Sequence, residues 1–507
     1  MSEAYKNSSK EDLIRENIQL KTDLSQIRQE LAELKRLIFG SRSERFVAQP
    51  LAGQLKLDLD TDAVQEPQAT TQEVISRVSK KKKPVRQKLP EHLPRTEIVI
   101  EPEADTTGLK RIGEEVTEYL GKHRATTFVI RIIRPKYAQA DEEGILIGKL
   151  PSRAIEKSNA DESLLADILV SKYVDHLPLY RQAQIFARQG VPIASSTMSD
   201  WVGACCKLLE PLYQALKKEV FLNEYIQADE SPIRVLSKSG SVKDKKRSAK
   251  KGKAHQGYQW VYHAKDPKLV LFDYRKGRGR DGPKEMLQKF KGYLQTDGYG
   301  VYDAFEKNPS VTLIGCMAHA RRYFVKAQDN DPVRAKYFLQ QVQLLYELER
   351  TLRDKNASWD DRYTVRQRLA RPILESLGQW LKAQSQEVLP KSAIGKAVHY
   401  SLHRWNKLCG YTKHGGLEID NNLIENLIRP LALGRKNYLF AGSHQGARNI
   451  AIMYSLLGSC KLNGLDPYEY LMAVLKKLPD YPISKISDLL PCHVRFEKPT
   501  TLEYKRV

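Results

Sequence analysis

Apolar positions near the N-terminus repeat with the seven-residue period of a coiled coil. Leu13, Leu20, Ile27 and Leu34 follow this spacing, and apolar residues at 24, 31 and 38 fall between them. We expect a coiled coil over residues 11–46 that joins copies of the chain through residues 13–38. A polar Asn17 at an a position favours a dimer. The alternative is an amphipathic helix that packs on its own domain.

The pattern changes twice before residue 150. Over residues 47–94 the chain is rich in Gln, Asp, Thr, Pro and Lys, which predicts a flexible linker because little apolar surface is available for burial. Residues 95–150 regain β-branched runs, and we expect a small β ribbon with strands at 96–100, 126–133 and 145–147.

Helical spacing dominates residues 155–215. Helices are expected at 163–170 and 180–188, followed by a glycine turn and a third helix capped by Ser195 or Ser196. This order is typical of a helix-turn-helix, in which the third helix would bring Thr197 and Ser199 to DNA. A helical hairpin that only builds a core fits the same pattern.

Short strands then alternate with helices, which predicts a multidomain α/β protein. Residues 220–329 read as the first part of a core, with strands at 225–236 (broken at Pro232), 258–263, 269–274 and 311–315, a further strand leading to Asp297, and a helix at 282–290. Residues 330–410 read as a helical insertion. Residues 411–479 complete the core with a helix capped by Asp420 or Asn421 and helices at 451–461 and 467–478, and 480–507 form a tail.

Charge narrows the class of partner. The 507 residues leave room for roughly three to four domains. Lys and Arg number 83 against 61 Asp and Glu, a net charge of +22. Such an excess favours a polyanion such as DNA, although a basic ribosomal or membrane-surface protein would have the same sign.

Cysteines and hydropathy bear on the compartment. The six cysteines form no C-x-x-C pair, which suits a reducing cytoplasm better than a disulfide scaffold. No signal peptide is visible, and no apolar run approaches the roughly 20 residues that span a bilayer. We expect a cytoplasmic protein without a membrane partner.

Three carboxylates stand at the ends of predicted elements. Asp229 and Asp297 each follow a short apolar run, and Glu425 lies about one turn into the predicted helix. Carboxylates on two strands and a helix are ligands that a pair of Mg²⁺ or Mn²⁺ ions would take. An aspartate at a strand end is more often a turn former, so each residue alone is weak support.

Taken together, these stretches resemble the insertion-sequence 66 transposases. Two further motifs carry the resemblance, Gly315-Cys-Met-Ala-His319-Ala-Arg321-Arg322-Tyr-Phe324 and Arg429-Pro-Leu-Ala-Leu-Gly-Arg435-Lys436-Asn437. The resemblance implies a ribonuclease-H-like mixed-sheet catalytic core with Asp229, Asp297 and Glu425 as catalytic triad and ligands of two metal ions. In the family a zinc ribbon occupies the region of residues 95–150. Here it has no cysteine, so we expect no zinc.

Basic residues near the triad complete the candidate site. We expect His319, Arg321, Arg322, Arg429, Arg435 and Lys436 to contact DNA. A lysine-rich stretch at 237–256 is either a phosphate-contacting arm or a solvated loop. The insertion either covers the active site and grips DNA or is only structural.

The predicted function is that of a DNA transposase. It would cut element ends and join the 3′-hydroxyl to target DNA by two-metal phosphoryl transfer, with accessory proteins from the same element as further partners. Two alternatives stay open: a catalytically decayed or recruited DNA-binding protein without strand transfer, and a nuclease that only cleaves.

Overall fold

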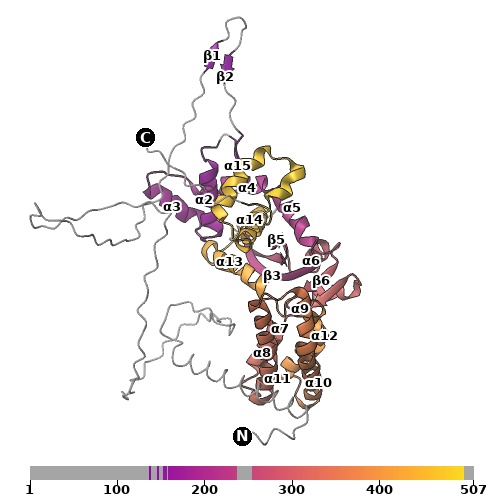
Figure 1. Ribbon diagram of the computed structural model, residues 1–507. Helices are drawn as coiled ribbons and strands as arrows, with labels where there is room; N and C mark the ends of the chain where they lie inside the picture. The colour runs from indigo at the N-terminus through magenta and orange to yellow at the C-terminus, as the bar shows by residue number, and fades with distance from the viewer. Residues whose placement is uncertain (1–135, 139–144, 148–151, 157, 237–253, 496–507) are drawn as a thin grey trace, which may run out of the picture. The chain divides into compact units, whose positions relative to one another are not determined.

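The computed structural model describes residues 136–138, 145–147, 152–156, 158–236 and 254–495 (Figure 1). The predicted coiled coil over 11–46, the linker over 47–94, most of the β ribbon, the lysine-rich segment 237–253 and the last residues of the tail lie outside the described residues. The described part therefore comprises one short hairpin and the helices and strands between residues 152 and 495.

The hairpin belongs to the region in which a β ribbon was predicted. Strands β1 (Lys136–Ala138) and β2 (Ile145–Ile147) pair antiparallel, with Tyr137 opposite Leu146. The strand at 145–147 is confirmed, whereas β1 was not predicted, because a Lys-Tyr-Ala stretch carries no apolar alternation.

Among the described residues, the helices that precede the sheet are α2 (Glu162–Tyr173), α3 (Leu179–Arg188), α4 (Ser195–Leu208) and α5 (Glu210–Phe221). Asp161 caps α2 by accepting a hydrogen bond from the Ser163 amide at 3.1 Å. The predicted serine cap of α4 is wrong: the helix begins at Ser195 after Ala194, and no side chain caps it. The helix can form without a cap because Met198, Val202, Cys205 and Cys206 anchor its buried face.

A five-stranded mixed sheet follows, in the order β5-β4-β3-β6-β7. Its strands are β3 (Tyr225–Leu236), β4 (Ala254–Ala264), β5 (Leu269–Arg275), β6 (Gly292–Gln295) and β7 (Val311–Ile314). β3, β4 and β5 form an antiparallel meander, while β6 pairs parallel with β3 and β7 parallel with β6. The sheet therefore places β3 in the centre, with the two parallel strands on one side of it.

Strand β3 does not break at Pro232 as predicted. It pairs continuously with β4, and Pro232 lies opposite Tyr258. On the side of β3 away from β4, the Ala441 amide donates to the Arg234 carbonyl, and the Leu236 amide donates to the Ala441 carbonyl. Backbone groups of every second residue face the same side of a strand, so the Pro232 nitrogen also faces away from β4. β3 pairs with β6 only as far as Gln227, so no β6 residue lies beside Pro232. Its missing N–H therefore costs the sheet no hydrogen bond.

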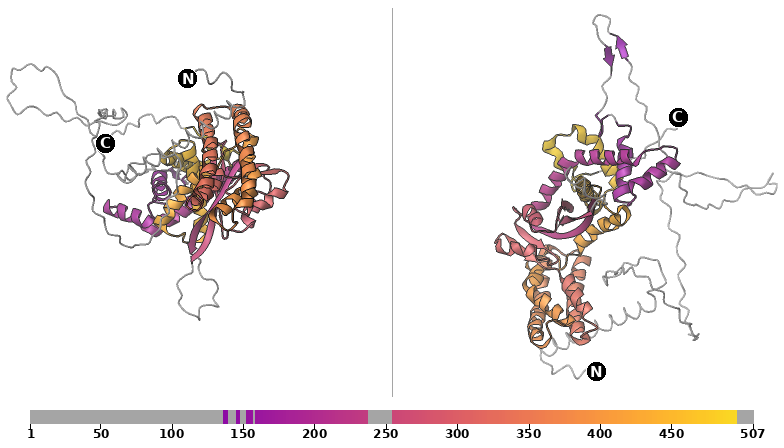
Figure 2. Two further views of the ribbon diagram at one scale, coloured as in Figure 1. Left: turned by 90° about the horizontal axis from the view of Figure 1, so that it is seen from below. Right: turned by 180° about the vertical axis from the view of Figure 1, so that it is seen from behind.

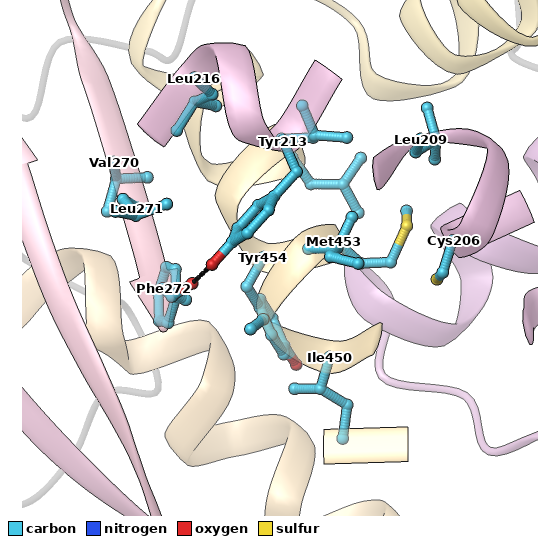
Figure 3. Packing of buried hydrophobic residues seen from close by; sticks show 14 of the residues in the cluster. Cys206, Leu209, Tyr213, Leu216, Val270, Leu271, Phe272, Ile450, Met453 and Tyr454 are labelled. Atoms are coloured by element: carbon cyan, nitrogen blue, oxygen red, sulfur yellow. Dashed lines mark hydrogen bonds between the residues drawn. The ribbon is translucent and has the colours of Figure 1, made fainter. Parts of the chain in front are cut away.

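The edge strand β5 is covered by helix α14 (His444–Leu462). Ser459 and Ser455 accept hydrogen bonds from the amides of Val270 (3.0 Å) and Phe272 (2.8 Å). Tyr213 of α5 donates to the Phe272 carbonyl at 2.8 Å, and Tyr454 and Met453 pack beside it (Figure 3). Backbone groups that an open sheet edge would expose are thus satisfied by side chains.

Helices from both ends of the described region share one hydrophobic core with the sheet. α2, α4 and α5 contribute to it together with α13 (Asn422–Tyr438), α14 and α15 (Pro467–Lys477). Short 3₁₀ turns at Leu478–Asp480 and Ile483–Leu489 follow, and Ile486, Leu489 and Leu490 in the predicted tail are buried in the same core. The helix-turn-helix-like segment is therefore packed on the sheet domain.

Helices occupy the chain between Asp297 and Glu425, where a helical insertion was predicted over residues 330–410. After α7 (Met317–Lys326) it contains α8 (Pro332–Asp354), α9 (Trp359–Val365), a π-helical turn (Arg366–Ala370), α10 (Arg371–Glu387), α11 (Ala393–His403) and α12 (Trp405–Cys409). α7, α8, α10 and α11 pack against one another around a second hydrophobic core (Figures 1 and 2).

Smaller elements complete the described chain. Helix α6 (Asp281–Met286) ends earlier than predicted, and Leu287 and Phe290 beyond it are buried. A 3₁₀ helix spans Tyr302–Lys307 and another Gly410–Lys413. Within these residues, none of the helices combines the length and apolar character that crossing a membrane requires.

Candidate active site

Asp229 and Asp297 occupy equivalent positions on two neighbouring parallel strands. β3 and β6 are registered with Gln227 opposite Gln295, and each aspartate lies two residues beyond its glutamine. Adjacent strands are about 4.8 Å apart, so the parallel register brings the two carboxylates to the same end of the sheet. The first two members of the predicted triad are thus brought together by strand pairing.

Asp229 is held in an environment that disfavours its charge. Burial, the negative charge of Asp297 and that of Glu230 raise the pKa of its carboxyl well above the ordinary value, and Glu425 adds to the effect. The Glu230 amide donates to Asp229 Oδ1 at 2.7 Å and offsets part of it. A carboxylate with this surplus of negative neighbours is suited to bind a cation.

Asp297 lies in a tight turn after β6. Its Oδ1 accepts a hydrogen bond from the Tyr299 amide at 2.8 Å, and Gly298 adopts a φ of +93°. A Cβ at Gly298 would lie 2.7 Å from Arg404 Nε, so only glycine fits this turn. The charge of Asp297 raises the pKa of Asp229, Glu230 and Glu425, which places it centrally among the carboxylates.

Glu425 lies in the first turn of α13 and is half-buried. Burial raises the pKa of its carboxyl; Arg322 and Arg429 lower it, while Asp420 and Asp297 raise it. Arg322 Nη2 lies 3.7 Å from Glu425 Oε1. Of the two predicted caps, Asp420 and Asn421, it is Asn421 that occupies the cap position, but its side chain makes no capping hydrogen bond. Its Nδ2 instead donates to the Ala228 carbonyl at 3.1 Å and ties the helix start to β3.

The donor set suits hard divalent cations, although a metal centre is not assembled. Oxygen ligands from Asp229, Asp297 and Glu425 are those that Mg²⁺ prefers, and their mutual repulsion is what a cation would relieve. Among the described residues, however, no three His, Cys, Asp or Glu side chains are grouped closely enough to hold one ion.

Glu230 is a fourth carboxylate that the sequence analysis left without a role. Its side chain is only 3% exposed and accepts a hydrogen bond from Arg278 Nε at 2.9 Å. Arg278 lies over the Tyr299 ring, 4.0 Å from its centroid. Its position next to Asp229 in the sequence was the available signal for Glu230. Only the structure shows that the charge of Glu230 is paired with Arg278.

His319 and Arg322 lie beside the carboxylates on α7. Burial and the Arg322 charge lower the pKa of His319 to about 4, while Asp297 opposes this. Arg322 Nη1 lies 3.3 Å from His319 Nε2, and arginine can only donate, so the neutral ring carries its proton on Nδ1. Arg321 is half-buried on the same helix.

The basic residues of α13 differ in their surroundings. Arg435 donates from Nη1 to Ser231 Oγ (3.0 Å) and Pro232 O (2.6 Å) and so supports β3. Arg429 and Lys436 are exposed. Thr197 and Ser199 are also exposed, on α4, and within the described residues no hydrogen bond or ion pair links them to the carboxylates.

Residues of the insertion hold the two segments that carry Asp297 and Glu425. Tyr400 donates to the Asp297 carbonyl at 3.1 Å, and Arg404 bonds the Gly298 carbonyl. Tyr346 donates to Asp420 Oδ2 at 2.7 Å. These contacts give the insertion a structural role at the site. The other role that the sequence allowed, covering the active site and gripping DNA, stays a prediction.

Sequence reasoning missed two buried amides beneath the aspartates. Gln227 and Gln295 are 1% and 0% exposed, and Gln227 Nε2 donates to Gln295 Oε1 at 2.9 Å. The signal was present, since Tyr225 to Asp229 and Tyr293 to Asp297 both read Tyr-x-Gln-x-Asp.

Comparison with known proteins assigns the family. The model of the Transposase IS66 family matches residues 157–449, more than half of the chain and the whole of the site. This chain belongs to the IS66 transposase family. Models of the IS66 C-terminal element and of the Transposase C of IS166 homeodomain match residues 455–492 and 26–98. IS66 membership makes DNA the partner and implies an enzyme that cuts and joins DNA.

Similar proteins in Sinorhizobium fredii (strain NBRC 101917 / NGR234) are named only as uncharacterized. This IS66 member is 33% identical over 494 residues to y4jD, across 93% of this chain and 95% of the relative. It is 35% identical to y4qI, across 79% and 76%. A crystal structure of the Mos1 strand transfer complex matches at 13% identity over 54% of this chain and 81% of that chain, with a TM-score of 0.13, too low to support an argument.

Proposed function

We propose that this IS66 transposase cuts the ends of its element and joins the freed 3′-hydroxyl to target DNA, with Asp229, Asp297 and Glu425 as catalytic residues. The observation that carries the proposal is the parallel register of β3 and β6, which aligns the two aspartates, together with the charge of Asp297, which raises the pKa of both Asp229 and Glu425. The strand order β5-β4-β3-β6-β7, antiparallel then parallel, supports a ribonuclease-H-like core.

The reaction consists of two phosphoryl transfers. In the first, water attacks a phosphodiester at the element end, the bond to the 3′-oxygen breaks, and that oxygen leaves as a 3′-hydroxyl. In the second, this hydroxyl attacks a target phosphodiester and releases a new 3′-hydroxyl there. Neither step needs a covalent bond between protein and DNA.

The side chains would divide the work. Asp229, Asp297 and Glu425 would hold two Mg²⁺ or Mn²⁺ ions, and such ions would supply activation of the attacking oxygen and stabilisation of the leaving one. Arg322 is placed between His319 and Glu425, where a guanidinium can contact a phosphate that enters the site. Exposed Arg429 and Lys436, with Thr197 and Ser199 on α4, would contact DNA further out.

Partners beyond DNA stay predictions. Self-association through residues 13–38 concerns a segment outside the described residues. Accessory proteins of the same element would act beside the transposase.

One observation favours a second candidate, a DNA-binding protein without strand transfer. No three metal-ligating side chains among the described residues are close enough to hold an ion together. The two candidates differ in one property, since only the first forms new DNA ends.

The test is cleavage and joining of a labelled element end in Mg²⁺, with and without the products of neighbouring genes. Wild type would be compared with Asp297→Asn, Glu425→Gln and the exposed control Asp329→Asn. We expect 3′-end cleavage and joining that both site variants lose and the control keeps. Specific binding without cleavage in every condition would favour the second candidate, and cleavage that survives both site substitutions would contradict the assigned triad.

A further inference from the structure

The Tyr-x-Gln-x-Asp motif occurs on both strands that carry the aspartates. β3 and β6 pair Tyr225 with Tyr293 and Gln227 with Gln295. Side chains two residues apart share a face of a strand, so Tyr225, Gln227 and Asp229 lie on one face of β3, and Tyr293 and Gln295 share a face of β6 just before the turn of Asp297. The two glutamines therefore form one buried pair directly beneath the two aspartates.

Gln295 uses its whole hydrogen-bonding capacity. Its Nε2 donates to Glu418 O (2.8 Å) and Gly315 O (3.1 Å). Its Oε1 accepts from Gln227 Nε2 (2.9 Å) and from the Tyr225 hydroxyl. Two donors and two acceptor positions are all that an amide offers, and the carbonyl partners fix its orientation.

Gln227 extends the same contact toward α13. Its Nε2 lies 3.0 Å from Asp420 O and 3.1 Å from the Tyr225 hydroxyl, while its Oε1 is buried without a hydrogen-bond partner among the described residues. The Tyr225 hydroxyl also accepts from the Glu418 amide at 3.3 Å. Gln227 and Gln295 thus bind the backbone of residues 418–420 through the Asp420 and Glu418 carbonyls.

Those residues lead directly into the helix of Glu425. Asn421 follows and donates from Nδ2 to Ala228 O, between Gln227 and Asp229. The glutamine pair and Asn421 therefore fix the start of α13 against the strand ends that carry both aspartates.

We propose that Gln227 and Gln295 are positioning residues that hold the 418–420 backbone, and through it Glu425, in place opposite Asp229 and Asp297. The proposal rests on the proposed function for its effect on catalysis, but the positioning itself is independent of activity. An amide is required because the pair must donate to backbone carbonyls and accept within itself, which neither methionine nor glutamate can do.

The decisive variant is Gln227→Met, which keeps the side-chain length and removes the donors. It also removes an acceptor that has no partner, but it leaves the Asp420 carbonyl without this donor, so Gln227→Met is compared with a control that loses a similar buried hydrogen bond elsewhere. Gln295→Met is the second variant. The matched control is Gln259→Met: Gln259 is 0% exposed on β4, and its Nε2 donates to Ala447 O at 2.9 Å, away from residues 418–420.

Two measurements on the full chain separate positioning from general destabilisation. Hydrogen exchange should become about tenfold faster at the amides of 418–425 in Gln227→Met and Gln295→Met and stay unchanged there in Gln259→Met. DNA cleavage at saturating DNA should fall about 10- to 100-fold in the first two variants, with little change in DNA affinity.

The outcomes are distinct. Unchanged exchange at 418–425 in both site variants, or the same increase in the Gln259→Met control, would overturn the proposal. Faster local exchange in a chain whose wild type does not cleave would support the positioning and contradict the proposed function. Faster exchange with undiminished cleavage would overturn the catalytic consequence.

Discussion

Tyr346 of α8 donates a hydrogen bond to Asp420 Oδ2 at 2.7 Å, which joins the helical insertion to the chain two residues before the start of α13. Asp420 also accepts from the Asn422 amide at 3.0 Å and from Asn422 Nδ2 at 2.7 Å. Burial raises the pKa of Asp420, and these hydrogen bonds oppose that effect. The insertion therefore helps to fix the start of the helix that carries Glu425.

Tyr346→Phe should destabilise the protein by about 1.5–3 kcal/mol, because it removes a hydrogen bond to a buried carboxylate. Chemical denaturation measures the loss. The control is Tyr411→Phe, since the buried Tyr411 hydroxyl has no hydrogen-bond partner among the described residues. Equal losses in the two variants would show that the bond to Asp420 adds nothing.

Asp229→Asn should stabilise the metal-free protein at neutral pH. The folded pKa of Asp229 is raised, so its ionisation costs stability as the pH rises through that pKa, and the cost vanishes below the unfolded value of about 3.9. Denaturation in a chelator from pH 4 to pH 8 should show a gain over wild type that grows with pH. Asp329→Asn should show no such growth, and a gain independent of pH would contradict the reasoning.

Mg²⁺ or Mn²⁺ should raise the thermal midpoint of the wild-type protein at neutral pH. Binding to the folded state adds about 2.7 kcal/mol at a concentration of 100 times Kd. Asp297→Asn should lose most of this shift, because it removes the carboxylate whose charge raises the pKa of both Asp229 and Glu425. The exposed control Asp329→Asn should keep the shift. The same shift in Asp297→Asn would place the bound metal elsewhere.

Arg366→Met should destabilise the insertion by about 3–5 kcal/mol, because it leaves Glu349 buried with a large part of its charge pairing lost. Arg366 is fully buried, bonds Glu349 Oε1 at 2.7 Å, and donates to the carbonyls of Tyr411 (3.0 Å) and Leu417 (2.8 Å).

The control for Arg366 is the double variant Glu349→Leu with Arg366→Met, which removes both charges. Denaturation should show a smaller loss for the double variant than for Arg366→Met alone. A larger loss would mean that the bond of Glu349 Oε2 to the buried Arg362, at 3.1 Å, outweighs the relief of removing the Glu349 charge.

Lys436→Ala and Arg435→Ala should separate DNA contact from support of the fold. Lys436 is exposed, so its loss should reduce the slope of log affinity against log salt by about 0.9, with unchanged stability. Arg435 bonds Ser231 and Pro232, so its loss should lower stability. DNA titrations at several salt concentrations and thermal unfolding of both variants check this, and an unchanged salt slope for Lys436→Ala would remove it from the DNA contact surface.

Local patterns were sufficient to predict most elements of the described region. Strands β4, β5 and β7, the helical character of the insertion and the helix of Glu425 follow from apolar runs and helical spacing, which are properties of adjacent residues. The interpretation was wrong at Pro232 and at the α4 cap, because sheet pairing and the burial of Met198 depend on residues far away in the sequence.

The sequence by itself determined the three carboxylates, the excess of positive charge and the motifs that the IS66 family model matches. Only the tertiary structure decided that Gln227 and Gln295 bond each other, that Arg435 supports β3, and that the helices of residues 155–215 share the core of the sheet. The physical reason is that strand register and side-chain hydrogen bonds join residues as far as 204 positions apart in the sequence, for which no local periodicity carries a signal.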